Sequence, residues 1–121
     1  MRAKRLKRRS DFLNVAQKGH KWVTPGLVLQ VLKQKESDTQ KDHKIRIGFT
    51  VTRKVGNAVI RNRVKRRLRS LCDELLALNQ GEGFDLVLIG RRTTITRNYD
   101  SLRADLAKAL KKTGVCVDAT L

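Results

Sequence analysis

The sequence contains few of the residues from which catalytic and metal centres are built. Its 121 residues include two histidines and two cysteines, and none of the four has a metal-ligand spacing. His20 and His43 lie far apart along the chain, which favours ordinary surface roles for both. The eleven acidic residues are scattered, and neither a nucleophile–base pairing nor a glycine-rich phosphate loop is present. We therefore expect no catalytic residue and no metal ligand in this chain.

Long apolar segments are absent as well. No run of eighteen apolar residues occurs, and no apolar segment follows the basic N-terminus MRAKRLKRR. We therefore expect neither a membrane span nor a signal peptide. Cys72 and Cys116 form no disulfide framework and fit a reducing compartment, which favours a cytoplasmic protein. Aromatic residues make up only 4% of the chain, so the core must consist mainly of Leu, Val and Ile.

Negative charge is scarce too. Lysine and arginine number 28 against 11 acidic residues, which gives a formal net charge of +17 and a pI of about 11.0. Such self-repulsion adds nothing to the stability of a globular domain, and its usual explanation is a polyanionic partner. The length is that of one domain with a modest core. We therefore expect a single nucleic-acid-binding domain over residues 1–121.

The order of the apolar patterns predicts a small α/β domain. The expected elements are a basic arm over 1–9, a helix from Ser10 or Asp11 to Gly19, and extended chain over 23–33 that Pro25-Gly26 could split into two strands. They continue with a polar loop over 33–44, a strand over 45–52, a helix from Asn57 to about Leu78, a turn at Gly81, a strand over 84–89, a helix after Asn98 and a flexible tail over 113–121. Within the strand over 45–52, Gly48 permits a close approach of backbone or a bulge. The order α-β-β-(β)-α-β-α predicts a two-layer sandwich, with helices covering one face of a small mixed sheet.

The helix expected after Asn57 combines an apolar stripe with a strongly basic surface. Its apolar residues recur at intervals of three or four and are Ile60, Val64, Leu68, Leu71, Leu75 and Leu78. Six cations lie off this stripe, with no acid before Asp73: Arg61, Arg63, Lys65, Arg66, Arg67 and Arg69. Solvated helical faces usually mix charges of both signs, and like charges three or four residues apart repel each other. The pattern therefore favours a phosphate-contact surface over an ordinary solvated face.

Phe12 has two interpretations. Its helical spacing from Val15 and Ala16 is typical of a core residue, and the pattern alone favours that reading. A half-exposed ring could instead stack on a nucleobase, as aromatic residues do in proteins that bind single strands.

Residues 52–69, TRKVGNAVIRNRVKRRLR, resemble the signature of the bacterial ribonuclease P protein component. The most specific part is the RNR core, Arg61-Asn62-Arg63, followed by Lys65-Arg66. The segments RLKRRSDF, KIRIGFTVTRK and FDLVLIGR and the helix expected over 99–110 fit the same family. The resemblance therefore covers nearly the whole chain.

This resemblance implies a small α/β sandwich whose basic helix joins parallel strands through a left-handed crossover, although about 98% of such connections are right-handed. It also implies that the chain does not cut RNA itself. Members of the family bind a large catalytic RNA, and the ribonucleoprotein removes the 5′ leader of precursor tRNA with Mg²⁺ held mainly by RNA. The expected partners are therefore the ribonuclease P catalytic RNA and precursor tRNA, with no membrane partner, and the free protein is expected to be a monomer.

The resemblance assigns residues to two surfaces. Those expected to bind the catalytic RNA are Asn57, Arg61, Asn62, Arg63, Lys65, Arg66 and Arg69, and their neighbour Arg67 is included with them. Those expected to bind the single-stranded leader are Phe12, Lys18, Thr50, Arg53 and Lys54, which shifts the interpretation of Phe12 toward a half-exposed ring. Some relatives carry aromatic residues at two positions that are Ala16 and Gln30 here. We therefore expect weaker stacking on the leader and a larger contribution from charge.

Other functions remain open at this point. Composition alone allows another RNA-binding module, such as a ribosomal protein, equally well. A metal-dependent nuclease that acts without RNA is a second alternative. A DNA-binding protein that inserts the basic helix into a major groove is a third, although no partner helix at the usual helix-turn-helix spacing is present.

Overall fold

The computed structural model describes residues 4–34, 45–76 and 83–115, which form a five-stranded mixed sheet in the order β1-β4-β5-β3-β2. The strands are β1 (Lys4–Arg5), β2 (His20–Val23), β3 (Leu27–Lys33), β4 (Arg46–Thr50) and β5 (Phe84–Gly90). Strand β4 runs parallel to β1 and β5, whereas β3 is antiparallel to both β5 and β2. The predicted mixed sheet is confirmed, and so is the division of the first extended segment at Pro25-Gly26.

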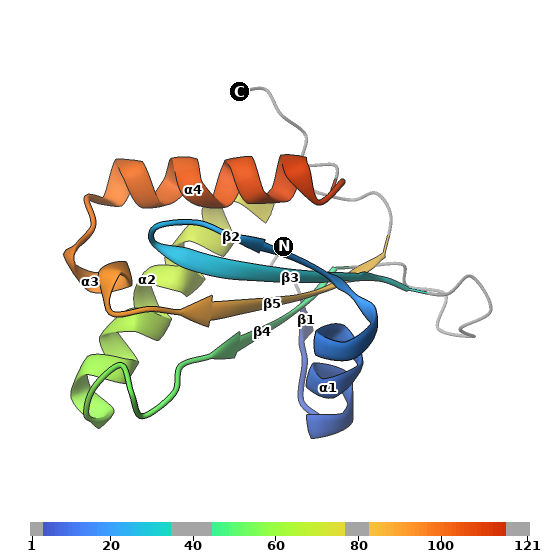
Figure 1. The fold of residues 1–121 in the computed structure, drawn as a ribbon, viewed down its shortest axis with the longest axis horizontal. Helices are drawn as coiled ribbons and strands as arrows, with labels where there is room; N and C mark the ends of the chain where they lie inside the picture. The colour runs from blue at the N-terminus through green and yellow to red at the C-terminus, as the bar shows by residue number, and fades with distance from the viewer. Residues whose placement is uncertain (1–3, 35–44, 77–82, 116–121) are drawn as a thin grey trace.

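The described residues contain four helices, α1 (Arg9–Lys18), α2 (Ala58–Leu76), α3 (Thr93–Thr96) and α4 (Tyr99–Lys112). Figure 1 shows α1 beside one end of the sheet, well separated from α2, α3 and α4. The long basic helix α2 connects the parallel neighbours β4 and β5. It is therefore the crossover to which the left-handed expectation applies, and its handedness stays a prediction.

The larger core lies between one face of the sheet and the helices α2 and α4. In β3, Leu27, Leu29 and Val31 alternate with more exposed residues and are buried on this face. They belong to one apolar cluster with the buried leucines of both helices, which include Leu68, Leu71, Leu102, Leu106 and Leu110. Removing this much apolar surface from water is the main force that holds α2 against the sheet.

Helix α1 packs on the opposite face of the sheet, which corrects the prediction that the helices cover one face only. A second, smaller cluster contains Leu6, Val15 of α1 and Val87 of β5, with Phe12 packed against it. Val87 alternates in β5 with the core residues Leu86 and Leu88, so its side chain points to the other face. Apart from Asp85, the residues of β5 are apolar on both faces, because both faces of this central strand are covered.

Both ends of the described chain are more ordered than expected. Lys4–Arg5 of the basic arm, for which no strand was expected, pair with β4, and Leu6 is buried. In the supposed tail, Gly114 turns the chain with φ of 84°, and the amide of Val115 donates to the carbonyl of Leu110 at 2.9 Å. Val115 is then buried in the larger core. A glycine at this position commonly ends a helix and returns an apolar residue to it.

Other boundaries also differ from the prediction. Strand β2 begins at His20, earlier than the expected residue 23, and the short helix α3 was not expected. The predicted turn at Gly81, most of the polar loop and the end of the long helix at Leu78 lie outside the described residues.

A partly buried ion pair joins β4 to β5. Asp85 is buried and stands opposite Arg46 in the register of the two strands. The guanidinium of Arg46 donates to both carboxylate oxygens, at 2.8 and 2.7 Å, and the side-chain amide of Gln34 donates to Asp85 Oδ1 at 2.9 Å. These donors stabilise the carboxylate within the sheet.

Candidate nucleic-acid interface

Helix α2 presents its basic side to solvent because its apolar stripe is fixed to the sheet. Asn57 caps the helix, and its Oδ1 accepts a hydrogen bond from the amide of Ile60 at 3.0 Å. This capping contact confirms the predicted start of the helix. Val64, Leu68 and Leu71 are completely buried, so the opposite side of the helix has to face outward.

Most of the cations predicted on α2 are available for an external partner. Asn62, Arg63, Arg66 and Arg69 are exposed, while Arg61 and Lys65 are half-buried. Among the described residues, none of the five cations in this group forms an ion pair with an acidic side chain. Arg61 Nε is buried without a hydrogen-bond partner in the described part of the chain. We call these six residues together the basic face.

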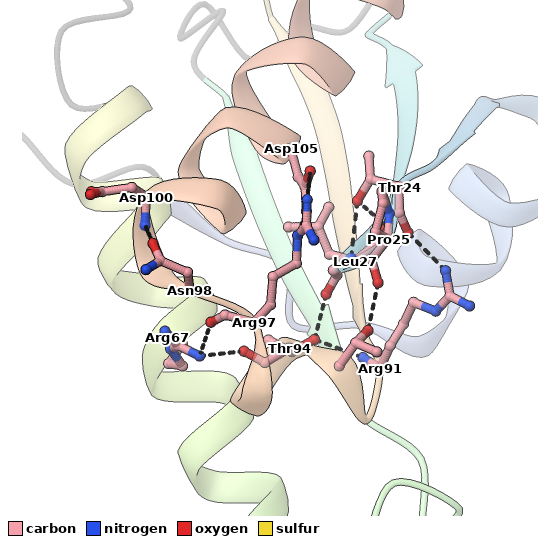
Figure 2. Close-up of polar contacts among 12 residues, drawn as sticks. Thr24, Pro25, Leu27, Arg67, Arg91, Thr94, Arg97, Asn98, Asp100 and Asp105 are labelled. Carbon is pink, nitrogen blue, oxygen red and sulfur yellow. Dashed lines mark hydrogen bonds and ion pairs between the residues drawn. The ribbon is translucent and has the colours of Figure 1, made fainter.

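Arg67 behaves differently from its neighbours. It is half-buried, and its Nη1 donates to the carbonyl oxygens of Thr94, Ile95 and Arg97 at 2.7, 2.5 and 2.9 Å. Figure 2 shows two of these bonds, which connect α2 to α3 and to Arg97, the residue after α3. No local pattern indicates this difference, because an arginine off the apolar stripe looks the same whether it faces solvent or a neighbouring helix.

Phe12 lies against the sheet at Gly48. A Cβ atom built on Gly48 would be only 2.5 Å from Phe12 Cζ and closer still to Cε1, so the ring fills the space that a side chain would occupy. The prediction that Gly48 permits a close approach is confirmed, although the approaching group is an aromatic side chain. Phe12 packs against the smaller apolar cluster but is only half-buried. It is therefore partly a core residue and still has ring surface open to a partner.

Beyond Phe12, the α1 side of the sheet carries a row of less covered side chains. The strand register places Val23, Val28, Ile89 and Thr50 next to one another across β2, β3, β5 and β4. Val23 is 55% exposed, and the other three are half-buried. Ile89 belongs to the cluster under α1, which assigns the row to that face. We call these four residues the open strip.

Four of the five residues predicted to bind the leader lie in or next to the open strip. Thr50 belongs to it, and Phe12 lies over Gly48, two residues earlier on β4. Arg53 and Lys54 follow β4 and are exposed, as is Lys18 in the last turn of α1. Val23, Val28 and Ile89 were not predicted to belong to this surface. Their positions follow from the pairing of strands distant in sequence, which alternation within one strand does not reveal.

The two positions where some relatives carry aromatic residues, Ala16 and Gln30, lie on the α1 side of the sheet. Gln30 pairs with Val87, which lies in the cluster under α1, and Ala16 is exposed on α1.

Arg92 was not predicted as a site residue, and its Nε donates to the carbonyl oxygen of Lys54 at 3.1 Å. This bond attaches the loop after β4 to the start of α3.

The described residues offer little acid–base or metal chemistry. Cys72 is buried, and burial together with nearby Asp73 raises the pKa of its thiol, so the sulfur is protonated and shielded. In the described ranges, no group of three His, Cys, Asp or Glu side chains could hold a metal ion. No described helix is both long and apolar enough to cross a membrane.

Comparisons with known sequences point to one protein family. The ribonuclease P family model matches residues 1–114. The ribonuclease P protein component of Gluconacetobacter diazotrophicus is 51% identical over 114 residues, which are 94% of this chain and 94% of the relative. The chain belongs to the ribonuclease P protein family. The corresponding protein of Paramagnetospirillum magneticum is 47% identical over 113 residues, which are 93% of this chain and 84% of the relative.

Solved ribonuclease P proteins have the same fold. The Staphylococcus aureus protein superposes with a TM-score of 0.75 at 29% identity, over 94% of this chain and 98% of that one. The Thermotoga maritima protein gives 0.72 at 29% identity, over 90% and 96% of the two chains. A ribonuclease P protein component is a subunit of an RNA–protein endoribonuclease, so the ribonuclease P RNA is a partner of this chain. Family membership decides against the ribosomal and DNA-binding alternatives.

Proposed function

We propose that this ribonuclease P protein binds two RNAs on opposite faces of its sheet. The ribonuclease P RNA binds the basic face of α2, and the single-stranded 5′ leader of precursor tRNA binds the open strip and Phe12. The observation that carries the proposal is the separation of the two surfaces. Helix α2 packs on one side of the sheet, whereas α1 and the open strip lie on the other. One chain can therefore contact catalyst and substrate at the same time.

The chemistry of α2 suits a folded RNA. Cations without acidic partners can neutralise phosphates and release counterions, which gives strong, salt-dependent binding. Arg61 supports this assignment because, among the described residues, it forms no ion pair with an acidic side chain, which leaves its half-buried guanidinium to bind a phosphate. Asn57 takes part mainly by capping the helix, since its Oδ1 already accepts the amide of Ile60.

The chemistry of the open strip suits a single strand. Unpaired bases bind apolar and aromatic surfaces through their flat faces, and neighbouring cations follow the backbone phosphates. Here Phe12 is the aromatic group, and Val23 and Val28 extend an apolar surface away from it. Arg53 and Lys54 lie just beyond Thr50 and supply the charge.

The net charge gives this arrangement a function in catalysis. Catalytic RNA and precursor tRNA repel each other, and a protein of charge +17 between them reduces that repulsion. We propose that the Mg²⁺ ions of the holoenzyme are held mainly by RNA, since the described residues contain no suitable cluster of ligands. The benefit of the protein should be largest at low salt and low Mg²⁺, where ions screen least.

The same charge bears on the state of the free protein. Two copies at +17 repel each other at moderate ionic strength, which supports a monomer in the absence of RNA. We also propose that the protein acts in the cytoplasm, because the buried, protonated thiol of Cys72 suits a reducing compartment.

Reconstitution tests the proposed function. The purified protein is combined with a bacterial ribonuclease P RNA and precursor tRNA at low Mg²⁺, with mature tRNA as the comparison ligand. We expect faster leader removal than with RNA alone and tighter binding of precursor than of mature tRNA. Equal affinity for the two tRNA forms would contradict leader binding, and cleavage by the protein alone would contradict the assignment of the chemistry to RNA.

A further inference from the structure

Arg67 lies in the basic segment of α2, but its guanidinium is turned toward α3. Nη1 carries two hydrogens, and three carbonyl oxygens converge on it at 2.5–2.9 Å. Two of the acceptors, Thr94 and Ile95, are carbonyls of the short helix α3, and the third belongs to Arg97, which follows it. Carbonyls at the end of a helix have no partner within that helix. The ring of Tyr99 lies beneath the same group, with its centroid 5.6 Å from Arg67 Cζ. A phosphate that attracted this side chain outward would leave those carbonyls without their donor.

The segment that Arg67 holds is in turn bound to the turn between β2 and β3. Thr93 Oγ1 donates to the carbonyl of Pro25, and Thr94 Oγ1 donates to that of Gly26 at 2.6 Å. Arg91 Nη1 donates to the carbonyl of Thr24 at 2.8 Å. Figure 2 shows how these side chains connect α3 to the turn. The route from α2 to the turn thus consists of consecutive hydrogen bonds.

The turn borders the open strip directly. Val23 is the last residue of β2, and Val28 is the second residue of β3, so residues 24–27 separate two members of the strip. A further bond joins the start of α3 to the loop after β4, where Arg92 Nε donates to the carbonyl of Lys54 at 3.1 Å. The α3 segment is therefore hydrogen-bonded both to the turn that borders the strip and to the loop after β4, which carries Arg53 and Lys54.

We propose that Arg67 is a positioning residue that connects the basic face to the open strip, and that it does not serve as a phosphate contact. Through α3, it holds the β2–β3 turn at a fixed place relative to α2. A protein docked on ribonuclease P RNA by α2 would then present the strip to the leader in one orientation. The inference rests on the two-surface function proposed above and adds a residue that links the surfaces.

Three variants test this proposal in the holoenzyme reconstituted with ribonuclease P RNA. Arg67→Met removes the donors and the charge but keeps an unbranched apolar stem. Arg67→Lys restores a cation whose single ammonium carries three donors, matching acceptors that converge on one atom. Arg66→Met is the matched comparison, because it removes the same charge from the adjacent, exposed position. Two quantities are measured: the salt dependence of assembly, and the ratio of affinities for precursor and mature tRNA.

We expect Arg67→Met to leave the salt slope of assembly unchanged and to lower the precursor preference by about 2- to 30-fold, the range found for residues that couple two sites. Arg67→Lys should recover most of the preference. Arg66→Met should lower the salt slope by up to about 0.7–0.9. The proposal is wrong if Arg67→Met lowers the slope as Arg66→Met does, or if it leaves the preference unchanged.

A second route tests the proposal without touching α2. Thr93→Val removes the exposed hydroxyl that binds Pro25 and changes no charge. We expect Thr93→Val to lower the preference for precursor over mature tRNA and to leave the salt slope of assembly unchanged. An unaffected preference would contradict the proposed link between α2 and the open strip. This test remains valid if Arg67→Met fails to fold. If the wild-type holoenzyme shows no preference for precursor tRNA, the proposed two-surface function is wrong. If only the variants behave differently from expectation, the role proposed for Arg67 is wrong and the two-surface function stands.

Discussion

Replacing Gly48 by alanine tests the contact that holds Phe12 on the sheet. The new Cβ would lie 2.5 Å from Phe12 Cζ, closer still to Phe12 Cε1, and 3.2 Å from Leu6 Cδ1. Carbon atoms pack at about 3.5–4.0 Å, so the ring would have to move by about 1 Å or more. Overpacking of this kind costs about 1–3 kcal/mol. For a domain of this size we expect a fall in Tm of about 4–12 °C.

The same substitution should have the opposite effect when the ring is absent. Phe12→Ala alone should cost about 2 kcal/mol, less than the about 3–5 kcal/mol of a fully buried phenylalanine, because the ring is half-buried. In that background the methyl group introduced by Gly48→Ala meets no ring. Replacing a strand glycine then favours folding by about 0.5–1 kcal/mol. The coupling between the two substitutions is the difference between these two effects, about 1.5–4 kcal/mol.

Urea denaturation of four proteins measures this coupling: wild type, Gly48→Ala, Phe12→Ala and the double variant. The midpoints and slopes give the free energy of unfolding of each protein. We expect Gly48→Ala to destabilise the wild type and to be neutral or stabilising in the Phe12→Ala protein. An equal cost in both backgrounds would refute the placement of the ring on Gly48, and with it the position of the aromatic group in the proposed leader surface.

Three further predictions concern other parts of the molecule. Arg61→Ala combined with Arg63→Ala should weaken assembly with ribonuclease P RNA and lower the salt slope by up to about 0.7–0.9 per lost phosphate contact; an unchanged slope in a filter-binding titration would place both residues away from RNA. Arg46→Ala should destabilise the protein by about 2 kcal/mol, less than the about 3–5 kcal/mol of a fully buried pair because Arg46 is 31% exposed. Arg46→Ala with Asp85→Asn should recover part of this loss in chemical denaturation, and no recovery would contradict the pair. The Cys72 thiol has a raised pKa in the folded state, so above its ordinary pKa of about 9 only the unfolded chain loses the proton. Stability should therefore fall more steeply with pH above 9 than in Cys72→Ala, and parallel pH profiles would show that the thiol ionises in the folded protein.

The sequence predicted the elements whose patterns are local. The stripe of Ile60, Val64, Leu68 and Leu71 identified α2 and its buried side, and Asn57 identified its start. The alternation of residues 45–52 and the apolar segment FDLVLI identified β4 and β5. In each case the pattern repeats over several residues, so the local preference for helix or strand is already strong. Packing against the rest of the protein then favours the same structure.

The features that the sequence did not reveal depend on residues distant along the chain. Strand β1 contains only Lys4–Arg5 and exists because β4 offers a free edge. Helix α1 could have packed on either face, and the apolar outer residue Val87 of β5 decides between them. The open strip follows from the register of four strands, and the role of Arg67 follows from the position of α3. None of these contacts has a periodic signal.

Site-specific cross-linking tests the central claim of two opposite RNA surfaces most directly. A photoreactive group is attached at Val23→Cys in the open strip or at Asn62→Cys on the basic face, both in a Cys116→Ser protein, where the buried Cys72 thiol is protected. Holoenzymes with labelled precursor tRNA are then irradiated. We expect the probe at position 23 to cross-link the 5′ leader and the probe at position 62 to cross-link ribonuclease P RNA. Cross-links to the leader from position 62, with none from position 23, would contradict the account.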